Sequence, residues 1–315
     1  MFREWELSHN KQLISIIIAT HNRPQLLTRT LDSVARQTYR PLEVVIVDDG
    51  SGNATRQAVH DWGRRARPGF RLSYQWQENQ GPATARNRGV EASSGERVQF
   101  LDDDDLLCPG ALEYLARALA GERSAIAMAS YQHWERGNPV GAAIRPRCME
   151  PDEMLRSMIQ GSWFVPIHGY LFTRSALEQI GPWNPVLTSQ EDDEFLLRAA
   201  IAGIPLRPAS DARVYYCRHD GARRATPGKP GETVDQGLEK RMFADLAIRE
   251  SVFETLGQRQ DMEQYRIAFS LWQMRLRKRY STALSRLNPQ SELLEWLGSS
   301  AEEAASGSSP PLASM

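Results

Sequence analysis

The sequence predicts an α/β fold, with a mostly parallel central sheet flanked by helices and a C-terminal helical extension. Two short runs rich in β-branched residues, LISIIIA at 13–19 and LEVVIV at 42–47, are typical of strands that are covered on both faces. Each run is followed by a polar turn and then by a helix-compatible segment. This alternation predicts parallel strands joined by right-handed crossovers.

The first two strand–helix pairs follow directly from the pattern. After the strand at 13–19, Pro24 suits the first position of a helix, and apolar residues then recur at helical spacing. The strand at 42–47 ends at the turn Asp48-Asp49-Gly50-Ser51. A second helix is expected to continue from that turn to about Trp62.

Further along the chain, the pattern predicts four more elements that bear on function. A helix is expected over 82–91, and the strand RVQFL at 97–101 leads into four consecutive aspartates, Asp102–Asp105. A helix over 111–119 follows. Another helix begins at the acidic cluster Glu191–Glu194, because FLLRAAIAGI behind it has apolar residues at helical spacing.

Length and composition exclude several classes of protein. The 315 residues, 41% of them hydrophobic, are enough to bury a full core, and a net charge of −1 gives no basic field that would indicate a nucleic-acid partner. Three widely spaced cysteines suit neither a disulfide framework nor a CxxC metal site. Nothing resembles a signal peptide or a membrane span. We therefore expect a soluble cytoplasmic protein.

The run Asp102–Asp105 carries the strongest chemical argument. Two carboxylates about 4 Å apart repel by roughly 4 kcal/mol at an effective dielectric constant near 20. A hard divalent cation, Mg²⁺ or Mn²⁺, would offset this repulsion, and its remaining ligand positions suit a diphosphate. The alternatives are a solvated acidic turn, or Asp105 as the N-cap of the next helix; capping explains Asp105 better than it explains all four residues.

The acidic cluster Glu191–Glu194 has two explanations. Acidic residues in the first turn of a helix are stabilised by the helix dipole, and no function is needed to account for them. A carboxylate that faces a metal–diphosphate site is also the general base required when an acceptor hydroxyl must lose its proton. The sequence leaves both explanations open.

Five segments occur in the order and spacing of family 2 glycosyltransferases, which the sequence resembles over residues 12–220. They are SIIIATHNRPQLLTRTLDSVARQT, VVIVDDGS, NQGPATARNRG, FLDDDD and EDDEFLLRAA. The resemblance implies the GT-A fold, a Mn²⁺ or Mg²⁺ cofactor, and inverting transfer from a nucleotide-diphosphate sugar, with a UDP-sugar favoured. It also implies a saccharide or lipid-linked saccharide acceptor and a role in cell-surface polysaccharide or glycolipid biosynthesis.

The resemblance also implies individual roles. The residues implied to contact the nucleotide or the donor sugar are Ala19, His21, Asp48, Asp49, Arg86, Asp102 and Asp103. His21 stands where a Tyr often stacks on uracil. Asp104 is implied to bind the metal and Asp192 to be the catalytic base. His219 is a second candidate metal ligand, and the alternative for it is a surface His after a strand.

The segment between the two acidic clusters is rich in aromatic residues and is expected to form the acceptor side. Flat apolar rings with polar edges suit sugars. We predict acceptor contacts from Trp163, His168 and Trp183, together with Glu191. Phe164 and Tyr170 are expected in the core instead.

The predicted organisation divides the chain into four parts. Residues 1–125 form the nucleotide-sugar-binding half, 126–225 the acceptor-binding half with the base, 226–300 the helical extension, and 301–315 a disordered tail. In the extension, 271–287 mixes apolar and basic residues. This helix either contacts an anionic membrane or packs on the catalytic domain with solvated arginines, and the usual role of amphipathic helices favours packing.

Three other classes compete with a transferase. A sugar nucleotidyltransferase usually carries a Gly-rich basic loop after its first strand, which THNRPQ lacks. A non-catalytic nucleotide-sugar-binding protein would most simply have lost the base or the metal-binding acids. A phosphohydrolase with an Asp nucleophile would place that acid directly after the first strand, where this chain has Thr20-His21-Asn22.

Overall fold

The computed structural model describes residues 11–64, 69–145, 147, 149–187, 189–218, 234–287 and 291–297. The chain forms two compact units, the first comprising Met1–Asp152 with Phe164–Arg223 and the second Glu153–Trp163 with Arg224–Met315. The candidate metal ligand His219 and the predicted tail at 301–315 lie outside the described residues.

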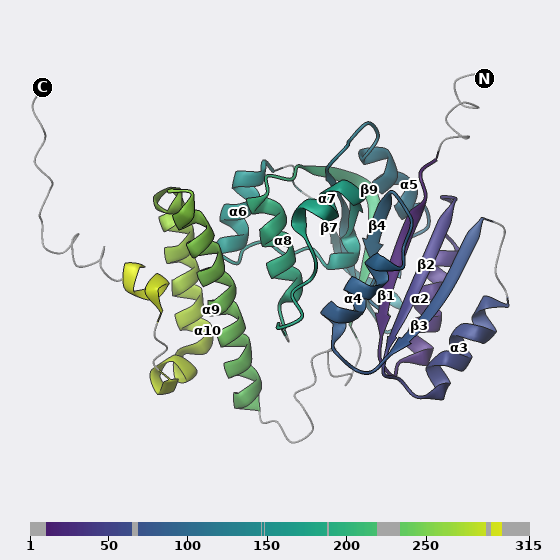
Figure 1. The fold of residues 1–315 in the computed structure, drawn as a ribbon, viewed down its shortest axis with the longest axis horizontal. Coiled ribbons are helices and arrows are strands. Elements are labelled where there is room, and N and C mark those ends of the chain that lie inside the picture. Colours follow the sequence, from purple (N-terminus) through teal and green to yellow (C-terminus); the bar gives the residue numbers. More distant parts are fainter. Residues whose placement is uncertain are drawn as a thin grey trace, which may run out of the picture. The chain divides into compact units, whose positions relative to one another are not determined.

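The first unit is an α/β structure (Figure 1). Its strands are β1 (Ile14–Thr20), β2 (Leu42–Asp49), β3 (Phe70–Gln77), β4 (Arg97–Phe100), β5 (Leu106–Leu107), β6 (Ile126–Glu135), β7 (Asn138–Ile144), β8 (Tyr170–Thr173) and β9 (Leu206–Arg218). Its helices are α2 (Pro24–Ala35), α3 (Asn53–Gly63), α4 (Pro82–Glu91), α5 (Ala111–Ala118), η1 (Ile167–Gly169), α7 (Arg174–Ile180) and α8 (Glu191–Ile201).

These strands form one sheet in the order β3-β2-β1-β4-β8-β6-β9-β5, with β7 paired to β6. The strands β3, β2, β1 and β4 are mutually parallel, and β9 is parallel to β6. Strand β8 lies antiparallel between β4 and β6. The predicted α/β fold, with a mostly parallel sheet flanked by helices and a C-terminal helical region, is therefore confirmed.

Helices cover both faces of the parallel strands, as the unbroken apolar runs predict. Ile16 and Ile46 belong to the core cluster that also contains Leu31 of α2 and Trp62 of α3. On the other face, Val45 and Val47 pack with Ala85 of α4. Helix α4 comes so close to β1 that a Cβ at Gly89 would lie 2.3 Å from a methyl carbon of Ile17, so glycine is required there.

Several strands have no counterpart among the predicted elements, β3 and β6 among them. Strand β3 (FRLSYQWQ) carries polar residues between its apolar ones, and most of its side chains are exposed or half-buried. It lies at the edge of the sheet, where an unbroken apolar run is not needed. A search for continuous apolar runs therefore misses it.

The second unit is helical. It contains most of α6 (Pro151–Ile159), together with α9 (Val234–Gln258), η2 (Met262–Tyr265), α10 (Arg266–Leu287) and a short helix at 292–297. In α10, Trp272, Leu276 and Tyr280 are buried, and Trp272 Nε1 donates a hydrogen bond to Asp245 of α9 at 3.2 Å. Three of the apolar positions in the 271–287 segment are thus buried by packing, whereas Met274 is 60% exposed, and membrane contact gains no support from the buried ones. Among the described helices, none has the length and apolarity that a bilayer span requires.

Candidate active site

The three polar turns singled out in the sequence lie along one edge of the sheet. Parallel strands place their carboxyl ends together, and ligands of such sheets bind there. Thr20 pairs with Asp48 across β1 and β2, while Leu101, just after β4, donates its N–H to the carbonyl of Ile17 in β1. The turns after β1, β2 and β4 are therefore neighbours, although 80 residues separate the first from the last.

The two aspartates at the end of β2 are held by neutral donors. The carboxylate of Asp48 accepts hydrogen bonds from Tyr74 Oη (2.5 Å) and from the backbone N–H of Ser51 (2.7 Å). The carboxylate of Asp49 accepts from Gln77 Nε2 (2.7 Å) and from two further backbone N–H groups at 80 and 81. Both aspartates are buried, so their carboxylates shape the turn and the loop before α4.

His21 is the exposed member of the predicted nucleobase group. Its Nδ1 lies 2.7 Å from the carbonyl oxygen of Asp49, and its Nε2 lies 3.0 Å from Nδ2 of Asn22. Ala19 is half-buried at the end of β1. The structure brings Ala19, His21, Asp48 and Asp49 to one place, and their contact with a base stays a prediction.

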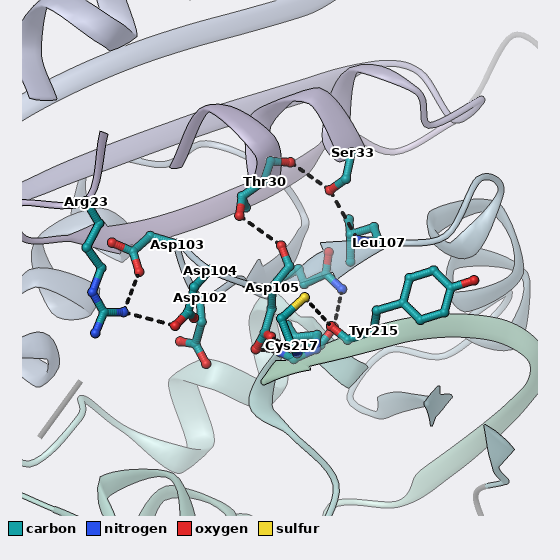
Figure 2. A network of polar contacts seen from close by, with 12 residues as sticks. Arg23, Thr30, Ser33, Asp102, Asp103, Asp104, Asp105, Leu107, Tyr215 and Cys217 are labelled. Atoms are coloured by element: carbon teal, nitrogen blue, oxygen red, sulfur yellow. Dashed lines mark hydrogen bonds and ion pairs between the residues drawn. The ribbon is translucent and has the colours of Figure 1, made fainter. Parts of the chain in front are cut away.

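Arg23 binds the middle of the aspartate run (Figure 2). Asp103 accepts hydrogen bonds from Thr20 Oγ1 (2.6 Å) and Arg23 Nη1 (3.2 Å), and Asp104 accepts from the same Nη1 at 3.0 Å. Burial raises the pKa of Asp103. Burial and the charges of Asp105, Asp102 and Asp103 raise the pKa of Asp104 to about 7 although Arg23 opposes this. One guanidinium group therefore does not neutralise the turn.

The last residue of the run, Asp105, is a structural anchor. Its Oδ1 accepts the backbone N–H of Cys217 in β9 at 2.6 Å, and its carbonyl accepts from Thr30 Oγ1 (Figure 2). Its Oδ2 lies 3.0 Å from Nδ1 of the fully buried His168. Burial opposes protonation of His168, but the nearby Asp105 carboxylate raises its pKa. The alternative of Asp105 as a helix cap is wrong, because Gly110 precedes α5 and its cap position has no side-chain bond.

A group of potential metal ligands includes this anchor. Asp102, Asp105 and His168 each offer one ligand atom, and these three atoms lie within 4.8 Å of one another. Carboxylate oxygens with an imidazole nitrogen suit a divalent cation such as Mn²⁺, and the uncompensated negative charge favours one. Asp104, the predicted ligand, is adjacent in sequence, but its carboxylate is paired with Arg23. The residues present thus fit a divalent metal, whichever of these acids binds it.

Arg86 joins the two acidic clusters. Its Nη2 lies 3.0 Å from Asp102, and its Nη1 lies 3.2 Å from Glu191 and 3.4 Å from Asp192. Burial opposes its charge, yet the three carboxylates raise the pKa of Arg86. Both terminal nitrogens of Arg86 are directed at carboxylates. Its contact with a nucleotide stays a prediction.

The guanidinium group of Arg86 packs on an aromatic stack. The guanidinium carbon lies 4.6 Å from the ring centroid of Trp183, which stacks on Phe195 of α8 with centroids 4.1 Å apart and planes 4° from parallel. Asn87 holds the backbone of Trp183 through two hydrogen bonds. This packing fixes the first turn of α8 beside Asp102.

Asp192 has the properties of a general base. Its Oδ1 is buried against Arg86, while 38% of the side chain is exposed to solvent. Burial raises the pKa of Asp192 to about 8; Arg86 opposes the shift, and the charges of Glu191 and Asp102 add to it. A carboxylate with such a pKa accepts a proton near neutral pH.

The predicted acceptor residues differ in exposure. His168 and Trp183 are buried, and Glu191 is paired with Arg86. Trp163 is half-buried and belongs to the second unit. Phe164, expected in the core, is 52% exposed, whereas Tyr170 is buried as expected. Acceptor contacts by the four predicted residues stay predictions.

Two parts of the site were not identified from the sequence. Arg23 follows β1 in a turn whose residues are ordinary for turns, and the pairing of Asp105 with His168 joins positions 63 apart in the chain. Because the ends of β1 and β4 share one edge of the sheet, the place of Arg23 in the turn after β1 is a usable signal. Nothing local indicates the partner of His168.

Comparisons with known proteins agree with this geometry. The sequence model described as Glycosyl transferase family 2 matches residues 15–181, which is more than half of the chain. The Bacillus subtilis protein "Uncharacterized glycosyltransferase YwdF" is 26% identical over 234 residues, covering 74% of this chain and 81% of that protein. A Campylobacter jejuni GalNAc(5)-diNAcBac-PP-undecaprenol beta-1,3-glucosyltransferase is 38% identical over 104 residues, 32% of this chain and 33% of that protein.

Solved structures show the same fold. The structure of Staphylococcus aureus TarS 1-349 in complex with UDP-GlcNAc matches with a TM-score of 0.60 at 20% identity, covering 85% of this chain and 72% of that chain. The mannosyltransferase PcManGT from Pyrobaculum calidifontis, in complex with GDP-Man and Mn²⁺, matches with a TM-score of 0.52 at 20% identity, covering 94% and 81%. The chain belongs to glycosyltransferase family 2 and has the GT-A fold.

Proposed function

We propose that this chain is an inverting, metal-dependent glycosyltransferase that moves a sugar from a nucleotide-diphosphate donor, preferably a UDP-sugar, to an acceptor hydroxyl. The observation that carries the proposal is the Arg86 bridge. It holds Asp192, a partly exposed carboxylate with a raised pKa, next to Asp102 in the aspartate run. Acid–base chemistry and diphosphate binding both require such an arrangement.

In this proposal each group has one role. Asp192 takes the proton of the acceptor hydroxyl as the hydroxyl oxygen attacks the anomeric carbon. Its ion pair with Arg86 orients Oδ1 and leaves the rest of the carboxyl accessible. Inversion requires one base on the face opposite the leaving group, so no covalent intermediate with the protein is needed.

Asp104, Asp102, Asp105 and His168 are the residues near which a cation would bind. A bound Mn²⁺ or Mg²⁺ supplies positive charge that offsets the charge developing on the leaving diphosphate. Arg23 neutralises part of the same turn through Asp103 and Asp104. The donor's base would lie against His21 and Ala19, the accessible residues at the end of β1.

The acceptor is proposed to be a saccharide or lipid-linked saccharide, used in the cytoplasm for cell-surface polysaccharide or glycolipid biosynthesis. One relative is named as a transferase to a saccharide on undecaprenol diphosphate, which supports this class of acceptor. The TarS structure in complex with UDP-GlcNAc supports a UDP-sugar donor.

The test is a calorimetric titration of UDP, GDP, dTDP and CDP, each with Mn²⁺, with Mg²⁺ and with EDTA. We expect tight binding of one diphosphate, UDP, that requires metal. Donor turnover is then measured with the corresponding UDP-sugars. If no diphosphate binds in a metal-dependent manner, the proposed function is wrong.

A further inference from the structure

Four aromatic side chains form a cluster next to the aspartate run. Tyr131 and His133 come from β6, Tyr216 comes from β9, and Phe164 precedes η1. The ring centroids are 5.7 Å apart for Tyr131–Phe164, 5.9 Å for Tyr131–His133, 5.8 Å for His133–Tyr216 and 5.7 Å for Phe164–Tyr216. Each ring therefore contacts two others, and we call the four residues the aromatic platform.

The platform has a buried floor and an open side. Tyr131 is buried, His133 and Tyr216 are half-buried, and Phe164 is 52% exposed. His133 and Tyr216 are direct partners across the parallel pair β6–β9, which places their side chains on the same face of the sheet. Phe164 thus extends an aromatic surface from the buried rings to solvent, where a flat ligand can pack on it.

The platform is continuous with the catalytic site. The Tyr216 ring stacks on His168, with centroids 6.4 Å apart and planes 29° from parallel, and His168 lies 3.0 Å from Asp105. The next residue, Cys217, donates its backbone N–H to the same aspartate. One imidazole ring thus separates the platform from the aspartate run. The acceptor hydroxyl must lie near the donor bound at that run in order to attack its anomeric carbon.

We propose that the aromatic platform binds a neutral sugar ring of the acceptor, an inference that rests on the proposed function. The apolar C–H face of a pyranose packs on flat rings, and its hydroxyls need hydrogen-bonding groups at the rim. The rim offers Arg218, whose Nη2 lies 3.4 Å from His133 Nε2 and whose Nη1 pairs with Glu135. His133 Nδ1 is buried without a hydrogen-bond partner in the described structure.

The same platform does not suit the nucleobase. The candidate base contacts His21 and Ala19 lie at the end of β1, and β4, β8 and β6 separate β1 from β9 in the sheet. The aspartate run lies between these two positions.

The test uses saturation-transfer NMR with the full chain and the methyl glycosides of glucose, galactose, mannose and N-acetylglucosamine, each with and without UDP and Mn²⁺. Phe164→Ala removes the exposed ring, and Phe164→Trp restores a flat one. Tyr114→Ala is the matched control, because Tyr114 is also an exposed aromatic residue (38%) but lies on α5. UDP titration of every variant monitors the donor site.

We expect at least one glycoside to bind the wild-type protein, and Phe164→Ala to weaken that binding about tenfold. Phe164→Trp and Tyr114→Ala should bind it like the wild type, and UDP affinity should not change in any variant. Glycoside binding that is unaffected by Phe164→Ala, or no glycoside binding at all, overturns the platform. Failure of the wild type to bind UDP, with Phe164-dependent glycoside binding intact, instead rejects the proposed function alone.

Discussion

The turns after β2 and β4 are both acidic and lie at the same edge of the sheet, yet they are stabilised in opposite ways. Asp48 and Asp49 accept hydrogen bonds from a phenol, an amide and backbone N–H groups, all of them neutral. Among the described contacts of the second turn, the carboxylates of Asp102–Asp105, with Glu191 and Asp192, share only Arg23, Arg86 and His168 as cationic or ionisable partners.

This difference separates a scaffold from a reaction site. Neutral donors satisfy the hydrogen-bonding capacity of a buried carboxylate, so the acids of the turn after β2 are supported without a cation. In the turn after β4, burial and the charges of the neighbouring aspartates raise the pKa of Asp104 to about 7. A carboxylate cluster of this kind gains stability when a cation binds. The following predictions test the contrast, from the largest expected effect to the smallest.

The largest effect is expected from Asp192→Asn. Loss of the general base should reduce the rate of sugar transfer by about 10³-fold, because the amide cannot accept the acceptor proton. Metal-dependent binding of UDP should remain, since Asp192 is not among the proposed metal ligands. Asp193→Asn, one residue further along α8, is the matched control. Near-normal turnover of Asp192→Asn, measured by UDP release in the presence of acceptor, would reject the base.

The second largest effect is expected on metal affinity. Its pattern distinguishes Asp104 as the metal ligand from the cluster of Asp102, Asp105 and His168. Asp104→Ala should weaken Mn²⁺-dependent UDP binding by about 100-fold, and His168→Gln by about tenfold if His168 only orients Asp105. Calorimetry with Mn²⁺ and UDP measures both. If His168→Gln is the more damaging change, the cluster of Asp102, Asp105 and His168 is the metal site and Asp104 is not.

Replacing an aspartate by a neutral residue should change the stability of the apo protein in opposite directions at the two turns. Asp49→Ala leaves the buried side-chain amide of Gln77 and the part-buried backbone N–H groups of Gln80 and Gly81 without an acceptor, and it should destabilise the fold by about 2–3 kcal/mol. The folded-state pKa of Asp104 is raised above 3.8, so its charge costs stability increasingly as the pH rises. Asp104→Asn should therefore stabilise the apo protein by about 1 kcal/mol at pH 8.

Urea unfolding in EDTA at pH 8 measures both effects. At acidic pH, where Asp104 is protonated in the folded and the unfolded protein alike, the gain from Asp104→Asn should disappear. If both variants change stability in the same direction at pH 8, the proposed contrast between the turns is wrong.

The smallest effect concerns pH. Because burial raises the pKa of Asp192 to about 8, the deprotonated base becomes more populated as the pH rises. At saturating metal, kcat/KM should increase about tenfold per pH unit below that value and level off above it. A profile that is flat between pH 6 and about 8 would show that another group accepts the proton.

Much of the donor side was predictable because it depends on local patterns. The apolar runs predicted β1, β2 and β4, and Pro82 marked the start of α4. The carboxyl ends of parallel strands share one edge, so their polar turns had to be close to one another. The acceptor side was less predictable, since its strands carry mixed polar and aromatic residues and include antiparallel pairs.

The sequence by itself determined which residues are candidates for the chemistry: the aspartate run, the acids that begin α8, and the strands that present the first of these. Only the tertiary structure decided their partners. Arg86 meets Glu191 across 105 positions, His168 meets Asp105, and Trp183 is buried while Phe164 is exposed. Periodicity reports which face of an element is apolar, but which distant element covers that face depends on the packing of the whole unit.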